Sequence, residues 1–272
     1  MRRVLTAIGL CAASLTMASP VFADDGDVDT TWGGTGIVLV GISDYDRVVA
    51  AHSYGSTGIQ IAGTVNSAGQ GGWFQASLLM RFRSDGTLDT SCNSSGYAMW
   101  TTQDPVNASD MAVLDDGSTI IVGTIASTQT QGVVLKYTPS CQLDNTFGIG
   151  GVATYTDRAG VSFSSVDIAV DDSIMVGGHT NYAQPDGGGT RFTVVKLTDD
   201  GTIDQSFGPS NNGVFVSDGL HQGRVADLFV DSSGRAVFAG TSTQNVDDDA
   251  VVGRLTPAGV LDPAYAASGW FT

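Results

Sequence analysis

The hydrophobic pattern of this chain is dominated by pairs of short apolar runs that flank a tight turn. Each run is rich in Val, Ile, Leu or Ala, and the turn between the two runs is built from Asp, Ser and Gly. Two β-rich runs around such a turn are typical of a β-hairpin. The pattern occurs four times, at residues 47–64, 109–124, 165–180 and 224–241. No run after residue 23 has a helical period, so we expect an all-β protein.

A second element follows each hairpin. An apolar run carries one basic residue, an Asp stands eight positions later, and a Gly with another short apolar run comes after it. The basic residues are Arg81, Lys136, Lys196 and Arg254, and the Asp residues are Asp89, Asp144, Asp204 and Asp262. Three positions after the Asp stands an aromatic residue or a Cys. A truncated copy near the amino terminus keeps only the Asp, which is Asp29.

The spacing of these Asp residues defines a long repeat. They lie 60, 55, 60 and 58 positions apart, which makes four full units. In each unit we name the hairpin strands A and B, the run with the basic residue C, and the last run D. In the second unit these strands are expected at 111–114, 119–122, 133–137 and 151–155.

Four short antiparallel strands repeated at this period predict a β-propeller of four-stranded blades. Two closures of the propeller are compatible with the sequence. One has four blades plus one extra strand at residues 36–40, and the other is a five-bladed ring. The Gly-Thr pairs that end strand B are expected to mark close backbone approach, and they lie at 63–64, 123–124 and 240–241.

The two elements together resemble the delta-60 repeat family, a β-propeller-like domain of uncharacterised function in exported bacterial proteins. The resemblance rests on the pattern D-G-x-L-D-x-x-F-G and on the hairpin pattern A-V-x-x-D-G-x-I-x-V-x-G-T. It covers nearly all of residues 24–272, and it implies an architecture without a catalytic residue. The sequence departs from the pattern at Cys92, which replaces the aromatic residue, at Ser140-Cys141, which replaces Asp-Gly, and at 261–265, which lacks Phe-Gly.

The amino terminus has the form of an export signal. Arg2 and Arg3 precede an apolar core, and Val21-Phe22-Ala23 forms a small-residue cleavage site. We therefore predict a signal peptide at 1–23, cleavage after Ala23, and a single propeller domain at 24–272 that is periplasmic or secreted. No other apolar run approaches the roughly 20 residues of a membrane span.

Charge and composition narrow the partners. Removing Arg2 and Arg3 from the 12 basic residues leaves 10 against 28 acidic ones, a formal charge of −18. A chain of this charge repels phosphate backbones, so we expect no nucleic-acid partner. All 28 acidic residues are Asp and 36 residues are Gly, and both residue types favour tight turns.

Two cysteines remain after residue 23. In an oxidising compartment Cys92 and Cys141 are candidates for one disulfide. The alternative is that both are small buried hydrophobic residues. Each lies three positions from the repeated Asp of its unit, so the two occupy comparable turns of adjacent units.

The repeated Asp and its basic counterpart are expected to be structural. The Asp would accept backbone N–H groups in the C–D turn, and the Arg or Lys at the end of strand C would face it. The alternative is a set of carboxylates that binds calcium. A binding site is rarely repeated in every unit, which favours the structural role.

Successive connections of an antiparallel blade alternate between its two ends, which separates an end with repeated turns from an end with variable loops. The A–B and C–D turns share one end of each sheet and keep their sequence, whereas the B–C and D–A loops share the other end and vary. Variable loops on a rigid scaffold commonly carry binding residues. The candidates on this face are Tyr45, Trp73, Tyr182 and His221, together with Asp44, Asp46, Asp186 and Asp218.

Exposed Tyr and Trp on these loops would bind a protein or a carbohydrate, and ordinary loop packing is the alternative. A weak calcium site is considered at Asp247, Asp248 and Asp249, and no other cofactor is expected. Catalysis has little support, because the three histidines, His52, His179 and His221, lack a recognisable catalytic motif. The rival hypothesis is a propeller hydrolase, lactonase or lyase that uses Asp or His near the central channel.

Overall fold

The structure is a computed structural model that describes residues 27–43, 45–55, 58–69, 72–183, 188–218, 222–242, 248–266 and 269–271, with the backbone alone at 67–69, 72–74 and 271. The chain divides into two compact units, residues 1–38 and residues 39–272. In the described part of the first unit, a turn is closed by Trp32 N donating to Asp29 O at 3.1 Å. The described residues contain no helix with the length and hydrophobicity that crossing a bilayer requires.

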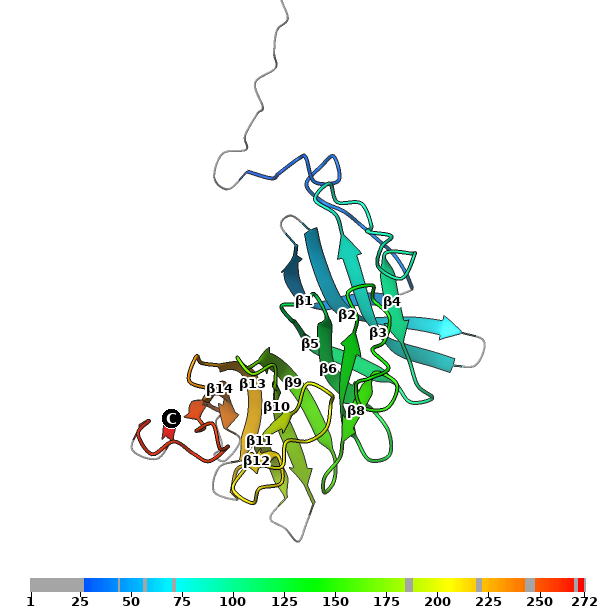
Figure 1. The fold of residues 1–272 in the computed structure, drawn as a ribbon. Coiled ribbons are helices and arrows are strands. Elements are labelled where there is room, and N and C mark those ends of the chain that lie inside the picture. Colours follow the sequence, from blue (N-terminus) through cyan, green and yellow to red (C-terminus); the bar gives the residue numbers. More distant parts are fainter. Residues whose placement is uncertain are drawn as a thin grey trace, which may run out of the picture. The chain divides into compact units, whose positions relative to one another are not determined.

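The second unit is an all-β propeller of four antiparallel, four-stranded blades (Figure 1). Blade one consists of β1 (Tyr45–Tyr54), β2 (Gly58–Gly69), β3 (Gly72–Phe82) and β4 (Tyr97–Trp100). Blade two consists of β5 (Val106–Val113), β6 (Thr119–Ile125), β7 (Gln131–Tyr137) and β8 (Val152–Tyr155). Blade three consists of β9 (Val161–Ile168), β10 (Ile174–Tyr182), β11 (Gly189–Leu197) and β12 (Val214–Val216). Blade four consists of β13 (Gly223–Val230), β14 (Ala236–Ser242), β15 (Asp249–Arg254) and β16 (Trp270–Phe271).

The four-stranded blades confirm the predicted strand order A-B-C-D. Strand bounds and the extra strand differ from the sequence analysis. Strand A of blade two begins at Val106, five positions earlier than expected, because a β-bulge between Ala108 and Asp110 interrupts its alternating pattern. The extra strand expected at residues 36–40 is absent, since residues 37–41 lie in no strand.

The hydrophobic core lies between consecutive blades. One cluster of buried side chains joins blades one and two, a second joins blades two and three, and a third joins blades three and four. The middle strand β6 sends Ile121 toward blade one and Ile120 and Val122 toward blade three, and all three are buried. Each internal blade is therefore covered on both faces by its neighbours.

Every A strand carries a β-bulge, and strand B places a Gly beside it. A Cβ at Gly63 or Gly123 would overlap the carbonyl oxygen of Arg47 or Asn107 across the bulge. Gly240 has the same relation to the carbonyl oxygen of Arg224. These glycines permit the close approach that the Gly-Thr pairs predicted.

Side chains at the bulge join each blade to the next. The Asp110 carboxylate in blade two accepts Val166 N of blade three at 2.9 Å, and Asp167 in blade three accepts Val230 N of blade four at 2.7 Å. The other contacts of this kind run from Ala108 N to Thr64 Oγ1 at 2.9 Å and from Leu228 N to Ser165 Oγ at 3.1 Å. In these four contacts a side chain of the earlier blade accepts a backbone N–H of the later A strand, so that edge is covered. The hydroxyls of Ser164 and Ser165 donate in the other direction, to Val225 O and Asp227 Oδ1.

Backbone hydrogen bonds set the eight-residue spacing of the C–D turn. In blade two, Asp144 N donates to Lys136 O at 2.9 Å, and Lys136 N donates to Gly151 O at 3.0 Å. The carboxylate of Asp144 then accepts the N–H of Thr146, two positions on, at 3.0 Å, which forms an Asx turn. The repeated Asp residues of the other copies accept the equivalent backbone N–H groups, which belong to Thr31, Ser91, Ser206 and Ala264.

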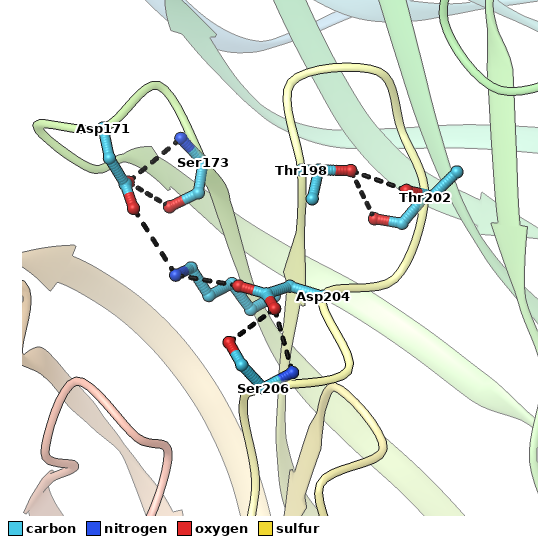
Figure 2. Close-up of polar contacts among 7 residues, drawn as sticks. Asp171, Ser173, Thr198, Thr202, Asp204 and Ser206 are labelled. Atoms are coloured by element: carbon cyan, nitrogen blue, oxygen red, sulfur yellow. Dashed lines mark hydrogen bonds and ion pairs between the residues drawn. The ribbon is translucent and has the colours of Figure 1, made fainter.

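The basic residue faces this Asp in three of the four blades. Lys196 Nζ lies 3.0 Å from Asp204 Oδ2 and 3.6 Å from Asp171 Oδ2, so it joins the C–D and A–B turns of blade three (Figure 2). The corresponding distances are 3.6 Å for Lys136 and Asp144 and 2.8 Å for Arg254 and Asp262. In blade three the pair thus holds two turns of the blade together.

Blade one departs from the expected pairing. The Arg81 guanidinium donates to Gln60 Oε1 at 2.8 and 3.0 Å and to Pro139 O of blade two at 2.7 Å. Asp89 forms its ion pair with Arg83 instead, at 3.5 Å. Arg81 is buried, and neutral oxygens within the protein satisfy its donors while Asp89 stays at the surface.

The C–D turns of successive blades also contact one another. The ring of Phe147 packs on Gly201 of the next blade so closely that a Cβ there would lie 2.8 Å from the ring. Beside it, Gly148 N donates to Asp200 O at 2.7 Å. Blades three and four repeat the arrangement with Phe207 against Gly259 and with Gly208 N donating to Ala258 O at 2.9 Å. We call this arrangement the turn contact.

A disulfide takes the place of the aromatic ring in the first turn contact. Cys92 and Cys141 are bonded, and they occupy the positions of Phe147 and Gly201. Cys141 has φ +60°, which matches the positive φ of the equivalent glycines. Asn93 N donates to Ser140 O at 2.9 Å, as in the other two contacts. The two departures from the repeat pattern therefore belong together, because the two cysteines replace the Phe and the Gly of a single turn contact.

We expect Asp204→Asn to lower the free energy of unfolding at pH 7 by about 1–2 kcal/mol. Hydrogen bonds from Ser206 and the ion pair with Lys196 lower the pKa of Asp204 to about 2. This stabilisation is present above the ordinary pKa of 3.8 and is lost as the pH falls toward 2. Urea unfolding between pH 7 and pH 2 should show a shallower acid decline for the variant. The exposed Asp248→Asn is the charge control, and equal curves for wild type and D204N would contradict the assignment.

Replacing both cysteines by Ala should lower stability by about 2–4 kcal/mol, because the disulfide closes a long loop. The double variant C92F/C141G should recover part of this loss, since it rebuilds the ring-on-glycine contact of the other blades. Thermal and urea unfolding of the two double variants, without reductant, measure the difference. If C92F/C141G is no more stable than C92A/C141A, the two kinds of turn contact are not equivalent.

Candidate functional site

The variable-loop candidates do not form one site in the described residues. Tyr45 begins β1 and is exposed, whereas Tyr182 ends β10 in blade three and is half-buried. The Tyr182 ring is covered by two arginines, with Arg191 Cζ at 4.5 Å and Arg158 Cζ at 5.4 Å from its centroid. Its face is thus used in loop packing, and it is not open for stacking on a ligand.

Several of the remaining candidates lie outside the described residues. These are the side chain of Trp73, whose backbone lies in β3, and His221, Asp44, Asp186 and Asp247. Asp46 is described, and its carboxylate accepts Ile42 N at 2.8 Å and the hydroxyl of Ser43 at 2.6 Å. These bonds order the start of β1, which is a structural role.

Only part of the Asp run considered for calcium lies in the described residues. Asp248 and Asp249 are exposed, and Asp247 lies outside the described residues. Within the described ranges, no group of three or more His, Cys or Asp side chains is arranged to hold a metal ion.

Asp110 is the carboxylate with the most distinctive environment. Burial raises its pKa above the ordinary value, and the nearby Asp227 carboxylate adds to the effect. The Ser165 hydroxyl donates to Asp227 Oδ1 at 3.0 Å. However, both oxygens of Asp110 accept backbone N–H groups, one from Met111 at 2.8 Å and one from Val166 at 2.9 Å. Its first role is therefore to join two blades.

A groove of about 450 Å³ follows the A strands of the first three blades. Its walls come from the ends of β5 and β9 and from the A–B turns that follow them, with His52 of β1 at one side. Two further cavities, of about 340 and 250 Å³, lie beside the same turns. All three lie at the repeated-turn end of the blades, opposite the variable loops.

The groove combines apolar and acidic groups. Val113, Ile168 and Val170 give it an apolar wall, and Val170 is 84% exposed. Asp115 and Asp172 at its rim are both exposed. The lining residues include no Trp, Tyr or Phe. Such a surface suits a ligand with both apolar and positively charged groups.

Sequence reasoning missed this groove because its residues belong to the repeated hairpins. We assigned the repeated turns a structural role, and their residues do hold the blades together. One sequence signal could have located the groove. Val170 is an apolar residue in an Asp-rich turn, and the structure shows that it is exposed.

Comparison with curated protein sequences finds no match. Among solved structures, the β-propeller domain of the Trilobed protease from Pyrococcus furiosus is similar over 79% of this chain, with 5% identity and a TM-score of 0.41. This chain spans 56% of that one. The α-L-arabinanase of Cellvibrio cellulosa, complexed with arabinohexaose, is similar over 80% of this chain and 76% of its own, with 10% identity and a TM-score of 0.36.

A glycosyl hydrolase from Bacteroides ovatus is similar over 84% of this chain and 70% of its own, with 10% identity and a TM-score of 0.33. At the level of sequence families, residues 59–91 and 171–207 match the family described as "Domain of unknown function (DUF5122) beta-propeller". The matched segments run from strand B to the C–D turn in blade one and from the A–B turn to the C–D turn in blade three, so the match covers parts of two of the four units.

Proposed function

We propose that this protein is an exported, non-enzymatic β-propeller of the delta-60 repeat type that binds a protein partner in its A-strand groove. The observation that carries the proposal is the groove itself, in which an exposed apolar wall lies beside the exposed carboxylates of Asp115 and Asp172. Export is supported by the signal-like start of the sequence and by the Cys92–Cys141 disulfide, which an oxidising compartment maintains.

A protein partner fits the groove better than a glycan does. Sugar rings are usually recognised by stacking on aromatic side chains, and the described lining has no Trp, Tyr or Phe. An extended segment with Lys or Arg next to aliphatic residues would place its charges on Asp115 and Asp172 and its apolar groups on Val170. The net charge, which is −16 for the full chain and −18 without Arg2 and Arg3, would also attract a basic partner over a distance.

The site proposed here differs from the one expected at the variable loops. Tyr182 is enclosed by arginines, and Asp46 is used within its own turn. Tyr45 is exposed and stays a candidate for a secondary contact. The protein is thus proposed to be a binding scaffold whose principal binding surface is the A-strand groove and not the variable loops.

The second candidate function is a hydrolase with Asp110 and Asp227 as its acid and base. The raised pKa of Asp110 and the bridging hydroxyl of Ser165 favour it. A panel of polysaccharide and lactone substrates tests this alternative. Turnover that disappears in Asp227→Asn would support the enzyme and contradict the non-enzymatic proposal.

We expect the double variant D115N/D172N to bind basic peptides about three- to tenfold more weakly than wild type at physiological salt, because each rim charge contributes modestly. The peptides are selected from a phage-displayed library and then measured as synthetic peptides by calorimetry. Val170→Ser should weaken binding further by removing apolar contact. Binding should also fall as the salt concentration rises.

The matched control is D104N/D248N, which changes the charge equally at exposed positions that do not line the groove. It should bind as wild type does. Equal losses in both double variants would mean that overall charge, and not the groove, determines binding. Selection of glycans or acidic peptides in place of basic ones would overturn the proposed partner class.

A further inference from the structure

The first blade exposes a surface that every other blade buries. Val48 in β1 is 55% exposed. The residues at the same place beside the bulge in β5, β9 and β13 are Ala108, Phe163 and Val225, and they are 2%, 2% and 1% exposed. Those three residues are covered by the preceding blade. Within the described chain, the corresponding cover over Val48 is missing.

The last blade exposes the complementary surface. Phe229 in β13 is 54% exposed, and Ala239 in β14 is exposed as well. In blade two the equivalents of these residues are Ala112 and Val122, which are buried against blade three. Blade four therefore offers the surface that a following blade would cover.

Asp227 in blade four is placed as Asp110 is in blade two. Each Asp follows the bulge of its A strand, and each accepts the N–H of the next residue through Oδ1, from Met111 at 2.8 Å and from Leu228 at 2.9 Å. The two carboxylates thus have the same orientation relative to their own strand.

The second carboxylate oxygen differs in its surroundings. In Asp110, Oδ2 accepts Val166 N of the next blade at 2.9 Å. Among the described residues, Oδ2 of Asp227 accepts no hydrogen bond. The residue of blade one that corresponds to Val166 is Ala51, which is exposed on β1. Asp227 and Ala51 are therefore the two halves of a contact that the internal blades already make.

We propose that blade four of one chain packs on blade one of a second copy, through the same contacts that join the internal blades. The Asp227 carboxylate of one copy accepts the Ala51 N–H of the other, and Phe229 packs beside Ser53. Ala239 packs on Val48, as its equivalent Gly177 lies against Val225 in the internal contact. Two such contacts, related by a twofold axis, close eight blades into one ring, which is within the usual range for propellers.

We choose a second copy as the partner because the two exposed surfaces correspond to the two sides of the contacts between the internal blades. The exposed surface of blade four matches the exposed surface of blade one, residue by residue, through the repeat. Within the described part of residues 39–272 these surfaces do not cover each other, since Val48 and Phe229 are both about half exposed. Open sheet edges with a matching surface are a common basis for association.

The first test is the mass of the protein in solution, measured by light scattering during size-exclusion chromatography over a range of concentrations. Wild type should have twice the chain mass of 28.0 kDa. Val48→Asp and Phe229→Asp should each weaken the dimer by about tenfold or more, because each buries a charge in the contact. The control Ile149→Asp, at an exposed apolar residue of a C–D turn, should leave the dimer unchanged.

Mixing the two edge variants tests the polarity of the contact. The Val48→Asp chain keeps an intact blade-four surface, and the Phe229→Asp chain keeps an intact blade-one surface. A mixed pair has one intact contact and one that carries both substitutions, whereas a pair of either variant alone has two damaged contacts. Because one buried charge already breaks a contact, the mixture should form a dimer that is weaker than wild type, at concentrations where each variant alone is monomeric. A dimer of wild type that survives both substitutions, or a wild type that is monomeric at every concentration, would overturn the proposal.

Cross-linking separates a second copy from closure within one chain. By analogy with Asp167 and Val230, Phe229 should lie beside Ser53 of its partner. The variant S53C/F229C, in a chain with Cys11→Ser, should form an oxidised product of doubled mass on a non-reducing gel. A cross-linked monomer would show that the chain closes on itself and would contradict association with a second copy.

Discussion

The fold depends on the contact between successive blades. A single four-stranded sheet of this protein has apolar side chains on both faces, as the buried residues of β6 show, and it cannot shield them from water alone. Neighbouring blades supply the cover, and three features align them. These are the bulge carboxylates and hydroxyls, the ring or disulfide on the next C–D turn, and the backbone hydrogen bond beside it.

The Cys92–Cys141 bond shows how this contact tolerates change. A Phe and a Gly form the contact in blades two to four, and both are replaced where blades one and two meet. Either change alone would leave a void or a side chain in the position of the ring. The two changes together fill the same space with a covalent link. The geometry of the turn is therefore kept while the chemistry that secures it differs.

Much of the fold could be predicted from the sequence, because it is encoded within each repeat. The hairpins, the C–D turn and the four complete repeat units follow from local alternation and from the spacing of the repeated Asp, although four and five blades both stayed compatible with the sequence. The partner of Arg81 could not be predicted in this way, since it lies in the next blade at Pro139. The missing strand at residues 36–40 has a similar cause, because an apolar run forms a strand only where another strand bonds its backbone.

The candidate site was harder to predict than the fold. Its groove exists only because three A strands from different repeats lie side by side, and each contributes residues that also belong to an ordinary hairpin. The sequence places aromatic residues such as Tyr182 in the variable loops, but it does not show that Arg158 and Arg191 cover that ring. Exposure in loops is therefore a weaker guide than exposure in the assembled blades.

The contacts that backbone N–H groups make at the bulges have a direction, since the earlier blade supplies the side-chain acceptor and the later one the N–H. A ribosome releases the chain in the same direction. Each blade would thus be synthesised after the preceding blade, which already carries the acceptors for the first strand of the new one. Repeats arranged in this way suit growth from the amino terminus, and duplication of a unit would extend the protein without requiring a new kind of contact.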